Sequence, residues 1–263
     1  MPELPEVETI RREIAPFVKG KIISGLEIKD PRNIKGISPA LLEKKLAGKK
    51  ILGVDRRAKY LVFPLSPAGF LVVHLGMTGR LLFAPDPYLK VTFVFKGGEK
   101  LYFSDARLFG KIRYFDADPP LDLGPEPFSK EFTAQKFGEM LAKKKTSIKL
   151  VLLDQKILSG VGNIYANEAL FRAGILPKRR ADDLSETEVK KLHKAILDVL
   201  EEAIEKRGTS DSWYVDASGK KGSFQERLQV YGRKGEPCFK CKTPIERISL
   251  GQRGTYFCPK CQK

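Results

Sequence analysis

The sequence predicts an α+β protein of several domains, and three features of the chain lead to this expectation. Short apolar runs broken by glycine and proline fill the first half, a helical repeat of apolar residues fills much of the second, and all four cysteines stand near the C-terminal end. A chain of 263 residues is too long for one small domain, and 42% hydrophobic residues suffice for a buried core. We therefore expect an N-terminal β-sandwich with an N-terminal helix, then a helical domain, then a small C-terminal hairpin module.

The N-terminal half shows one helical repeat followed by strand-like runs. Residues 4–18 predict a helix, because apolar residues recur there at helical spacing. These residues are Val7, Ile10, Ile14 and Phe17. Short β-rich runs then predict strands of a sandwich or barrel. The runs are residues 51–54, 60–63, 70–75, 91–95 and 101–103, and the last two flank a Gly-Gly turn that is typical of a hairpin.

A proline-rich segment divides the chain. Residues 117–129 contain four prolines and almost no periodicity, so they are the best candidate for a linker. We expect a sandwich domain that carries the catalytic residues, a linker, a helical domain and a zinc finger. Their expected bounds are residues 1–118, 119–130, 131–234 and 235–263.

The second half is predominantly helical in pattern. Ser185 and Glu188 form a capping box, and the apolar residues within 189–204 lie on one face of the helix that follows. Gly208 is expected to close this helix as the first residue beyond its C-cap. Residues 209–223 are polar and weakly patterned, which predicts a mobile loop.

The charge balance indicates a polyanionic partner. Lys and Arg number 48 against 32 acidic residues, which gives a net charge of +16. This excess favours nucleic acid or a membrane surface. Nucleic acid is the better candidate, because the chain contains no basic amphipathic helix with bulky aromatic residues opposite the charge. No apolar stretch approaches the ~20 residues of a membrane span and no signal peptide is apparent, so we expect a soluble, cytoplasmic protein.

Two histidines are too few for His-rich metal sites and for most His-based triads. His74 stands in an apolar run, where a core or edge histidine is expected. His193 stands on the charged face of a helix, where a solvated side chain is expected.

The cysteines form two closely spaced pairs. Cys238-x-x-Cys241 and Cys258-x-x-Cys261 are separated by sixteen residues, and four thiolates at this spacing close a tetrahedral zinc shell. Four protein ligands leave no open position, so this zinc is structural; two disulfides are the weaker alternative in a reducing compartment. Arg253 would lie at the tip of a hairpin between the pairs, where it suits contact with a phosphate. Zinc ribbons also dock proteins, so the motif alone does not establish DNA binding.

A glycine-containing turn precedes another expected helix. Gly160 and Gly162 stand before residues 164–172, so backbone N–H groups and Asn163 could approach a phosphate there. A plain turn between two helices fits equally well. The basic flank of Lys143, Lys144, Lys145 and Lys149 is either a phosphate track or a solvated face.

The N-terminus offers a nucleophile. Removal of Met1 would expose the secondary amine of Pro2 next to Glu3. An α-amino group titrates at about 7.7–8.0, so a useful fraction is neutral at pH 7 and can attack an aldehyde-like sugar carbon, as lysine does in Schiff-base enzymes. Glu3 could then supply acid catalysis.

Short segments spread over the whole chain carry a family resemblance. In chain order they are residues 2–8, 56–60, 74–77, 105–110, 124–127, 160–166 and 229–233, followed by the four cysteines. Together they resemble the bacterial formamidopyrimidine-DNA glycosylase family. The resemblance implies a bifunctional DNA glycosylase and AP lyase of base excision repair with a helix–two-turn–helix domain and a zinc-ribbon hairpin. It also implies one structural zinc, a monomer at the nucleoid, and a double-stranded DNA substrate with an oxidised purine or an abasic site.

The resemblance also implies roles for individual residues. Pro2 attacks the anomeric carbon and Glu3 protonates the sugar ring oxygen, while Lys59 serves β-elimination and Arg253 serves δ-elimination. Met77, Arg107 and Phe109 fill the void that the extruded base leaves, although a Met or Phe in a β domain, such as Met77 or Phe109, is mostly a core residue. The remaining matches are phosphate contacts by Asn163, Lys145 and Lys149, and a loop with Lys220 that closes over the extruded base.

The chain departs from the family pattern at two positions. Tyr88 stands where a DNA-contacting histidine is expected, which leaves its contact with DNA in doubt, and Leu108 stands where a second arginine is frequent. Two alternatives remain open. The sister enzyme endonuclease VIII removes oxidised pyrimidines with the same Pro-Glu pair, but it opens Pro-Glu-Gly-Pro where this chain has Leu4. A non-catalytic zinc-ribbon protein would explain the charge and the cysteines but not Pro2, Glu3 or Lys59.

Overall fold

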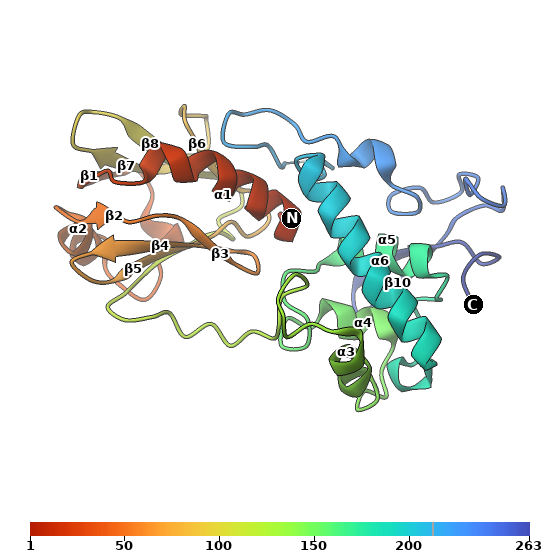
Figure 1. Ribbon diagram of the computed structural model, residues 1–263. Helices are drawn as coiled ribbons and strands as arrows, with labels where there is room; N and C mark the ends of the chain where they lie inside the picture. The colour runs from red at the N-terminus through yellow and green to blue at the C-terminus, as the bar shows by residue number, and fades with distance from the viewer. Residues whose placement is uncertain (212) are drawn as a thin grey trace. The chain divides into compact units, whose positions relative to one another are not determined.

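The structure is a computed structural model that describes residues 1–211 and 213–263 (Figure 1). The chain forms two compact units, and each is made of two stretches of sequence. The first unit comprises Met1–Leu121 and Lys206–Gln225, and the second comprises Asp122–Glu205 and Glu226–Lys263. None of the helices in the described part of the chain is long and apolar enough to cross a membrane.

The first unit is a β-sandwich of two antiparallel sheets. One sheet has the strand order β1-β7-β8-β6, and the other has the order β2-β4-β5-β9 with β3 beside β4. The strands of the first sheet are β1 (Ile23–Ile28), β6 (Gly79–Leu82), β7 (Leu89–Phe95) and β8 (Lys100–Asp105). Those of the second are β2 (Lys50–Ile51), β3 (Asp55–Arg57), β4 (Tyr60–Ser66), β5 (Phe70–His74) and β9 (Lys111–Phe115).

The core of this unit lies between the sheets and helix α1 (Leu4–Val18), drawn in red in Figure 1. Val7, Ile10 and Ile14 of α1 are fully buried in one cluster with residues of both sheets, such as Phe63 and Phe103. The apolar repeat therefore predicted α1 correctly, and the expected N-terminal β-sandwich is confirmed. The remaining elements of the unit are α2 (Pro39–Leu46) and the 3₁₀ turn η1 (Pro31–Asn33).

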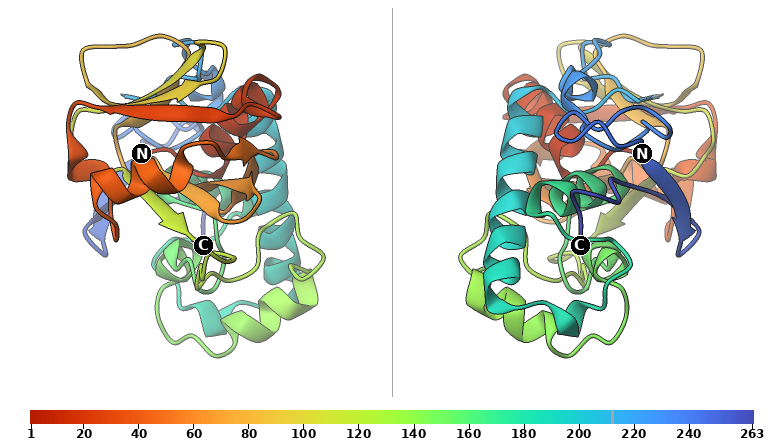
Figure 2. Two further views of the ribbon diagram at one scale, coloured as in Figure 1. Left: turned by 90° about the vertical axis from the view of Figure 1, so that its left-hand side faces the viewer. Right: turned by 90° about the vertical axis from the view of Figure 1, so that its right-hand side faces the viewer.

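The second unit is helical and ends in a two-stranded hairpin. Both α3 and α5 pack against the long helix α6, which is cyan in Figures 1 and 2. The helices are α3 (Ala134–Leu141), α4 (Ile148–Leu153), α5 (Asn163–Ala173) and α6 (Glu186–Glu205); the hairpin strands are β10 (Glu246–Leu250) and β11 (Arg253–Phe257), and the 3₁₀ turns are η2 (Ala181–Asp183) and η3 (Phe224–Arg227). Residues 117–129, all of which the structure describes, contain neither helix nor strand.

Helix α6 begins as the capping box predicts but ends earlier than expected. Ser185 Oγ accepts a hydrogen bond from Glu188 N, and Ser185 N donates to the Glu188 carboxylate at 2.9 Å. The helix ends at Glu205, so the expectation that Gly208 follows its C-cap is wrong. Gly208 has a φ of +81°, and a Cβ there would lie 2.7 Å from a carboxylate oxygen of Glu6. The glycine allows this close approach of two segments of the first unit.

The expectation of a solvated His193 is also wrong. Its Nε2 lies 2.9 Å from the carbonyl oxygen of Phe132, and its ring centroid lies 4.7 Å from that of Phe132. The histidine therefore helps to hold the segment before α3 against α6.

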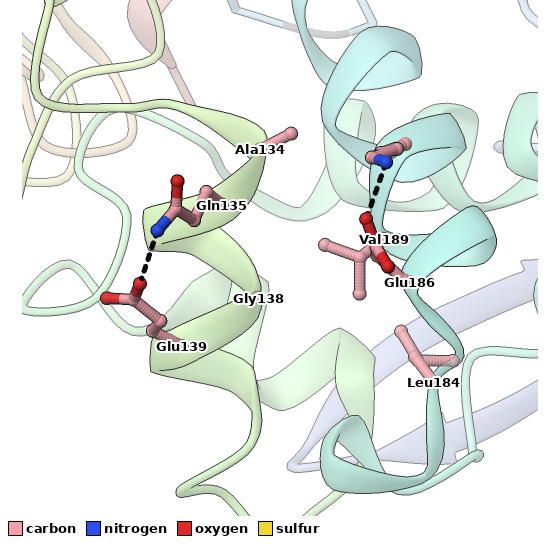
Figure 3. Close-up of a pocket in the computed structure, with 8 residues that line it drawn as sticks. Ala134, Gln135, Gly138, Glu139, Leu184, Glu186 and Val189 are labelled. Atoms are coloured by element: carbon pink, nitrogen blue, oxygen red, sulfur yellow. Dashed lines mark hydrogen bonds and ion pairs between the residues drawn. The ribbon is translucent and has the colours of Figure 1, made fainter.

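A cavity of about 510 Å³ lies between α3 and α6 (Figure 3). Its lining residues are Ala134, Gln135, Gly138, Glu139, Leu184, Glu186, Val189 and Lys190. Its polar side chains pair with one another, because Gln135 donates to Glu139 and Lys190 forms an ion pair with Glu186. None of the candidate site residues lines this cavity.

Candidate active site and metal centre

Pro2 and Glu3 lie at the N-terminus of α1. Glu3 is the N-cap residue of the helix, and both it and Pro2 are buried, whereas Met1 is exposed. The Glu6 carboxylate accepts a hydrogen bond from Glu3 N at 2.7 Å, which fixes the first turn. The positive end of the helix dipole is directed toward this terminus.

Glu6 also ties the helix terminus to a distant segment. Its second oxygen accepts a hydrogen bond from Thr209 N at 2.8 Å, next to the closely packed Gly208. One buried carboxylate thus holds the backbone of Glu3 and the start of the stretch 206–225. The Glu3-x-x-Glu6 capping pattern could have indicated the first contact, but no sequence signal indicates a partner 203 residues away.

Lys59 lies in the two-residue turn between β3 and β4, next to Ala58, which has a φ of +54°. Arg56 anchors this hairpin, because it donates to the Glu8 carboxylate of α1 at 3.1 Å and to the Ala58 carbonyl at 3.1 Å. Burial would raise the pKa of Glu8, but hydrogen bonds from Arg11 and Arg12 and the nearby charge of Arg56 outweigh it and lower that pKa to about 2.

His74 ends β5 near Lys59. Its ring lies 4.7 Å from the ring of Tyr60, and its Nδ1 accepts a hydrogen bond from Gly76 N at 3.1 Å. Burial, together with the positive charges of Lys59, Lys111 and Arg113, lowers the pKa of His74 to about 4. The expected core or edge histidine is therefore a half-buried, neutral side chain at a strand end.

Met77, Arg107 and Phe109 stand on two adjoining turns of the sandwich. Phe109 is 48% exposed, so a core role does not apply to it, and the Arg107 guanidinium lies 4.9 Å from the centroid of its ring. Met77 is half-buried. Leu108 has a φ of +61°, an uncommon conformation for a leucine, and it shapes the turn between the other two side chains.

The buried carboxylate of Asp105 connects these two turns through hydrogen bonds. It is fully buried and accepts hydrogen bonds from Thr78 Oγ1 at 2.5 Å, from Gly110 N at 2.7 Å and from Asn33 Nδ2 at 2.9 Å. Thr78 Oγ1 in turn accepts from Arg107 N at 3.1 Å. Met77, which precedes Thr78, is thereby fixed relative to Arg107 and Phe109. Asp105 stands in one of the segments that carry the family resemblance, but its structural role was not predicted from the sequence.

In the second unit, Asn163 and Lys149 support the zinc-finger hairpin. Lys149 is fully buried, and its Nζ donates to the Gly254 carbonyl at 3.0 Å and to Thr255 Oγ1 at 2.6 Å. Asn163 Nδ2 also donates to the Gly254 carbonyl, at 3.1 Å. Arg253 is exposed directly after the hairpin turn, and Lys145 is exposed before α4.

The four cysteines form a site for one zinc ion. Their Sγ atoms all lie within 4.8 Å of one another, with 3.9 Å between Cys238 and Cys261 and 3.4 Å between Cys241 and Cys258. A tetrahedron with Zn–S bonds of about 2.3 Å has edges of about 3.8 Å, which these separations fit. None of the cysteines forms a disulfide. Buried Phe171, Val230 and Ile245 pack around the sulfurs, as expected for a structural site closed to substrate.

The structure thus places the sequence-predicted residues in two groups. Pro2, Glu3, Lys59, Met77, Arg107, Phe109, Tyr88 and Lys220 belong to the first unit, and Lys145, Lys149, Asn163, Arg253 and the cysteines belong to the second. Helix α1 packs against β3 and β4, so the Pro2 terminus and the Lys59 hairpin belong to one packed assembly. Tyr88 is 40% exposed, and Lys220 is exposed in the stretch 206–225.

Three family models match successive parts of the chain. Residues 1–112 match the formamidopyrimidine-DNA glycosylase N-terminal domain, residues 123–213 match the H2TH domain of the same glycosylase, and residues 235–263 match a zinc finger found in FPG and IleRS. Together with the fold and the cysteine cluster, they define an H2TH protein with a zinc finger. The chain belongs to the formamidopyrimidine-DNA glycosylase family, as the resemblance predicted.

Individual relatives match over the full length. The formamidopyrimidine-DNA glycosylase of Symbiobacterium thermophilum is 46% identical, with 100% of this chain and 89% of that protein covered, and that of Desulfitobacterium hafniense is 42% identical with both fully covered. The crystal structure of MutM (Fpg) from Thermus thermophilus is 43% identical with a TM-score of 0.91, covering 99% of this chain and 98% of that one. Lactococcus lactis Fpg in complex with DNA containing an abasic site is 38% identical with a TM-score of 0.92, covering 99% of each chain.

Proposed function

We propose that this protein is a DNA glycosylase and AP lyase that excises oxidised purines, such as 8-oxoguanine and formamidopyrimidines, from double-stranded DNA. The buried Pro2-Glu3 pair at the N-terminus of α1, in a chain of this family, carries the proposal. Solved relatives bind DNA that contains an abasic site or Fapy-dG, which supports the substrate class. A DNA substrate also places the activity in the cytoplasm at the nucleoid.

The proposed chemistry begins at the Pro2 nitrogen. After removal of Met1, this nitrogen attacks C1′ of the damaged nucleotide; the N–C1′ bond forms as the glycosidic bond breaks, and the base departs with the bond electrons and takes up a proton. Glu3 protonates the ring oxygen as the sugar opens to a Schiff base. The Schiff base acidifies C2′, so loss of a proton there expels the 3′ phosphate, and a second elimination expels the 5′ phosphate.

Cationic side chains are proposed to assist the two eliminations. Lys59, held close to α1 by the Arg56 anchor, serves the β-elimination. Arg253 is exposed on a hairpin braced by Lys149 and Asn163, where it can bind the phosphate that leaves in the δ-elimination.

Extrusion of the base requires residues that replace it in the stack. The exposed Phe109 ring and Met77 supply an apolar wedge, and Arg107 supplies a guanidinium that can hydrogen-bond the orphaned cytosine. The Asp105 network holds the three in a fixed arrangement, which lowers the entropy lost on insertion.

The remaining residues are proposed to grip the DNA backbone and the extruded base. Lys145 and Asn163 contact phosphates, and Lys220 belongs to the segment that closes over the base. Lys149 differs, because its ammonium is buried against Gly254 and Thr255. We assign it to positioning the hairpin that carries Arg253 instead of direct contact with a phosphate.

Substitution of Pro2 tests the proposal. Pro2→Gly is expected to abolish normal strand cleavage of a duplex with 8-oxoguanine opposite cytosine while its affinity for that duplex stays near that of the parent protein. Cleavage by Pro2→Gly at the parent rate would contradict the proline mechanism. Binding without any cleavage by the parent protein, with Met1 shown to be removed and zinc bound, would favour a non-catalytic zinc-ribbon protein.

A further inference from the structure

The only tryptophan of the chain, Trp213, contacts the sandwich from the stretch 206–225 of the same unit. Its carbonyl oxygen accepts a hydrogen bond from Arg80 Nε at 3.0 Å, and the Arg80 guanidinium carbon lies 5.5 Å from its ring centroid. The Tyr88 ring packs edge-on against the indole, with centroids 5.4 Å apart and planes at 75°. Trp213 is therefore held through its backbone and its ring together.

The surface that receives Trp213 is fixed by further contacts within the sandwich. Asp86 forms an ion pair with Arg80 Nη1 at 3.0 Å and accepts a hydrogen bond from Tyr88 N at 2.9 Å. The side chains of Arg80 and Asp86 are 18% and 16% exposed, so the pair is largely shielded from water. Arg80 and Tyr88 are thus oriented by β6 and the turn after it.

The segment contacts the rest of its unit at further places, among them Tyr214 and Ala217, which are buried in the core of the sandwich. Near one end, Thr209 N is bound to Glu6, and further along Ala217 donates to Glu13 and accepts from Phe83 N at 3.0 Å. A cavity of about 320 Å³ remains between residues 80–86 and 215–219, lined by residues of both stretches. The aromatic contact at Trp213 therefore adds to the core packing of Tyr214 and lies beside an unfilled space.

We propose that Trp213 is a latch, which means a positioning residue that holds the stretch 206–225 where this stretch encloses the extruded base. Arg80 and Tyr88 are the residues that bind Trp213. The inference rests on the proposed function, which assigns that base to this segment. Because Thr209 is bound to Glu6, and Glu6 also holds Glu3 N, the latched segment is connected to the nucleophile's own helix turn. The sequence suggested a contact of Tyr88 with DNA. In this proposal Tyr88 instead holds the stretch 206–225 through its ring contact with Trp213.

The first test uses the intrinsic fluorescence of the DNA-free protein, which reports on Trp213 alone among tryptophans. Tyr88→Ala is expected to shift the emission to longer wavelength and to increase quenching by acrylamide, because the indole loses its aromatic neighbour. Leu41→Ala, on the exposed side of α2, is the control and should leave both unchanged. Identical spectra and quenching in Tyr88→Ala and the parent protein would overturn the latch.

The second test compares two DNA duplexes. Trp213→Ala should lower base excision from the 8-oxoguanine duplex about three- to tenfold, the worth of one aromatic contact, and Trp213→Phe should restore most of it. Strand cleavage at a preformed abasic site should stay at the parent rate, because that substrate has no base to enclose. Equal losses on both duplexes, or no loss on either, would overturn the inference. Failure of the parent protein on both duplexes would instead refute the proposed function, while the fluorescence test still decides the contact.

Discussion

At the scale of single residues, His74 shows how the candidate site makes stability depend on pH. Its pKa is lowered from 6.5 to about 4 by burial and by the charges of Lys59, Lys111 and Arg113. Between these values the unfolded chain binds a proton that the folded chain does not, so the free energy of unfolding rises with pH. The folded state is therefore most favoured above pH 6.5, and His74 destabilises it progressively as the pH falls toward 4.

We predict that the protein loses on the order of 2 kcal/mol of stability through His74 between pH 7 and pH 5. His74→Gln should lose correspondingly less over the same interval, because glutamine does not titrate. Urea unfolding of both proteins at the two pH values measures the difference. An equal decrease in both would show that His74 does not carry the effect.

Residue identity predicted the metal site better than it predicted the placement of other side chains. The four zinc-binding cysteines could be named from the sequence, because their role depends on residue type and local spacing; the roles of Pro2 and Glu3 stay a prediction. The phosphate contact expected for Lys149 fits poorly with its burial, since a lysine run does not reveal that a hairpin 105 residues away will cover one member. The role of Asp105 was not predicted for the same reason, as its partners Asn33 and Thr78 come from other parts of the chain.

At the scale of elements, the β10–β11 hairpin allows an experiment to distinguish a residue that positions the hairpin from a residue that contacts a phosphate. Each phosphate that a side chain neutralises adds about one to the slope of log affinity against log salt concentration. Arg253→Gln should therefore weaken DNA binding and reduce this slope by about one. Lys149→Met should weaken binding while the slope stays at the parent value, because its ammonium is buried in the hairpin support.

Binding titrations at several salt concentrations measure both slopes. Zinc content serves as the control, and both variants should retain one ion per chain. A slope reduced equally in both variants would assign Lys149 to a phosphate and contradict the positioning role.

The sequence predicted some elements well and missed others for physical reasons. Helix α1 and the β7–β8 hairpin have strong apolar periodicity and a Gly-Gly turn, and both form as expected. The run 51–54 becomes only the short β2, with Leu52 half-exposed beyond it. Four strands of the sandwich were missed, namely β1, β3, β6 and β9. Strand β1 contains a register shift near Gly25, and β9 buries only Ile112 fully.

At the scale of the whole molecule, residue grouping depends on contacts that sequence order does not show. The expected domain bounds assign residues 206–225 to the helical domain, whereas the compact units place them with the sandwich. Hydrogen bonds from Thr209 to Glu6 and from Ala217 to Glu13 account for this difference. Both carboxylates lie on α1, about 200 residues earlier in the chain.

Zinc removal is predicted to affect the second unit selectively. A chelator should release one zinc per chain and unfold the finger, because structural zinc supplies folding free energy to so small a module. DNA binding should then fall strongly, since Arg253 depends on this hairpin, while Trp213 emission from the first unit stays unchanged. Metal analysis, DNA titration and fluorescence on one sample measure all three; undiminished DNA binding by the zinc-free protein would contradict the assignment.

The most direct test of the central claim is borohydride trapping with a duplex that carries 8-oxoguanine opposite cytosine. Reduction of a Schiff base to an amine should yield a covalent protein–DNA adduct, and peptide mapping should place it on Pro2 with Met1 removed. An adduct on a lysine, or no adduct from zinc-loaded protein with a free Pro2, would contradict proline catalysis on this substrate. In the second case, a thymine-glycol duplex would then distinguish a pyrimidine-specific enzyme from a protein that only binds DNA.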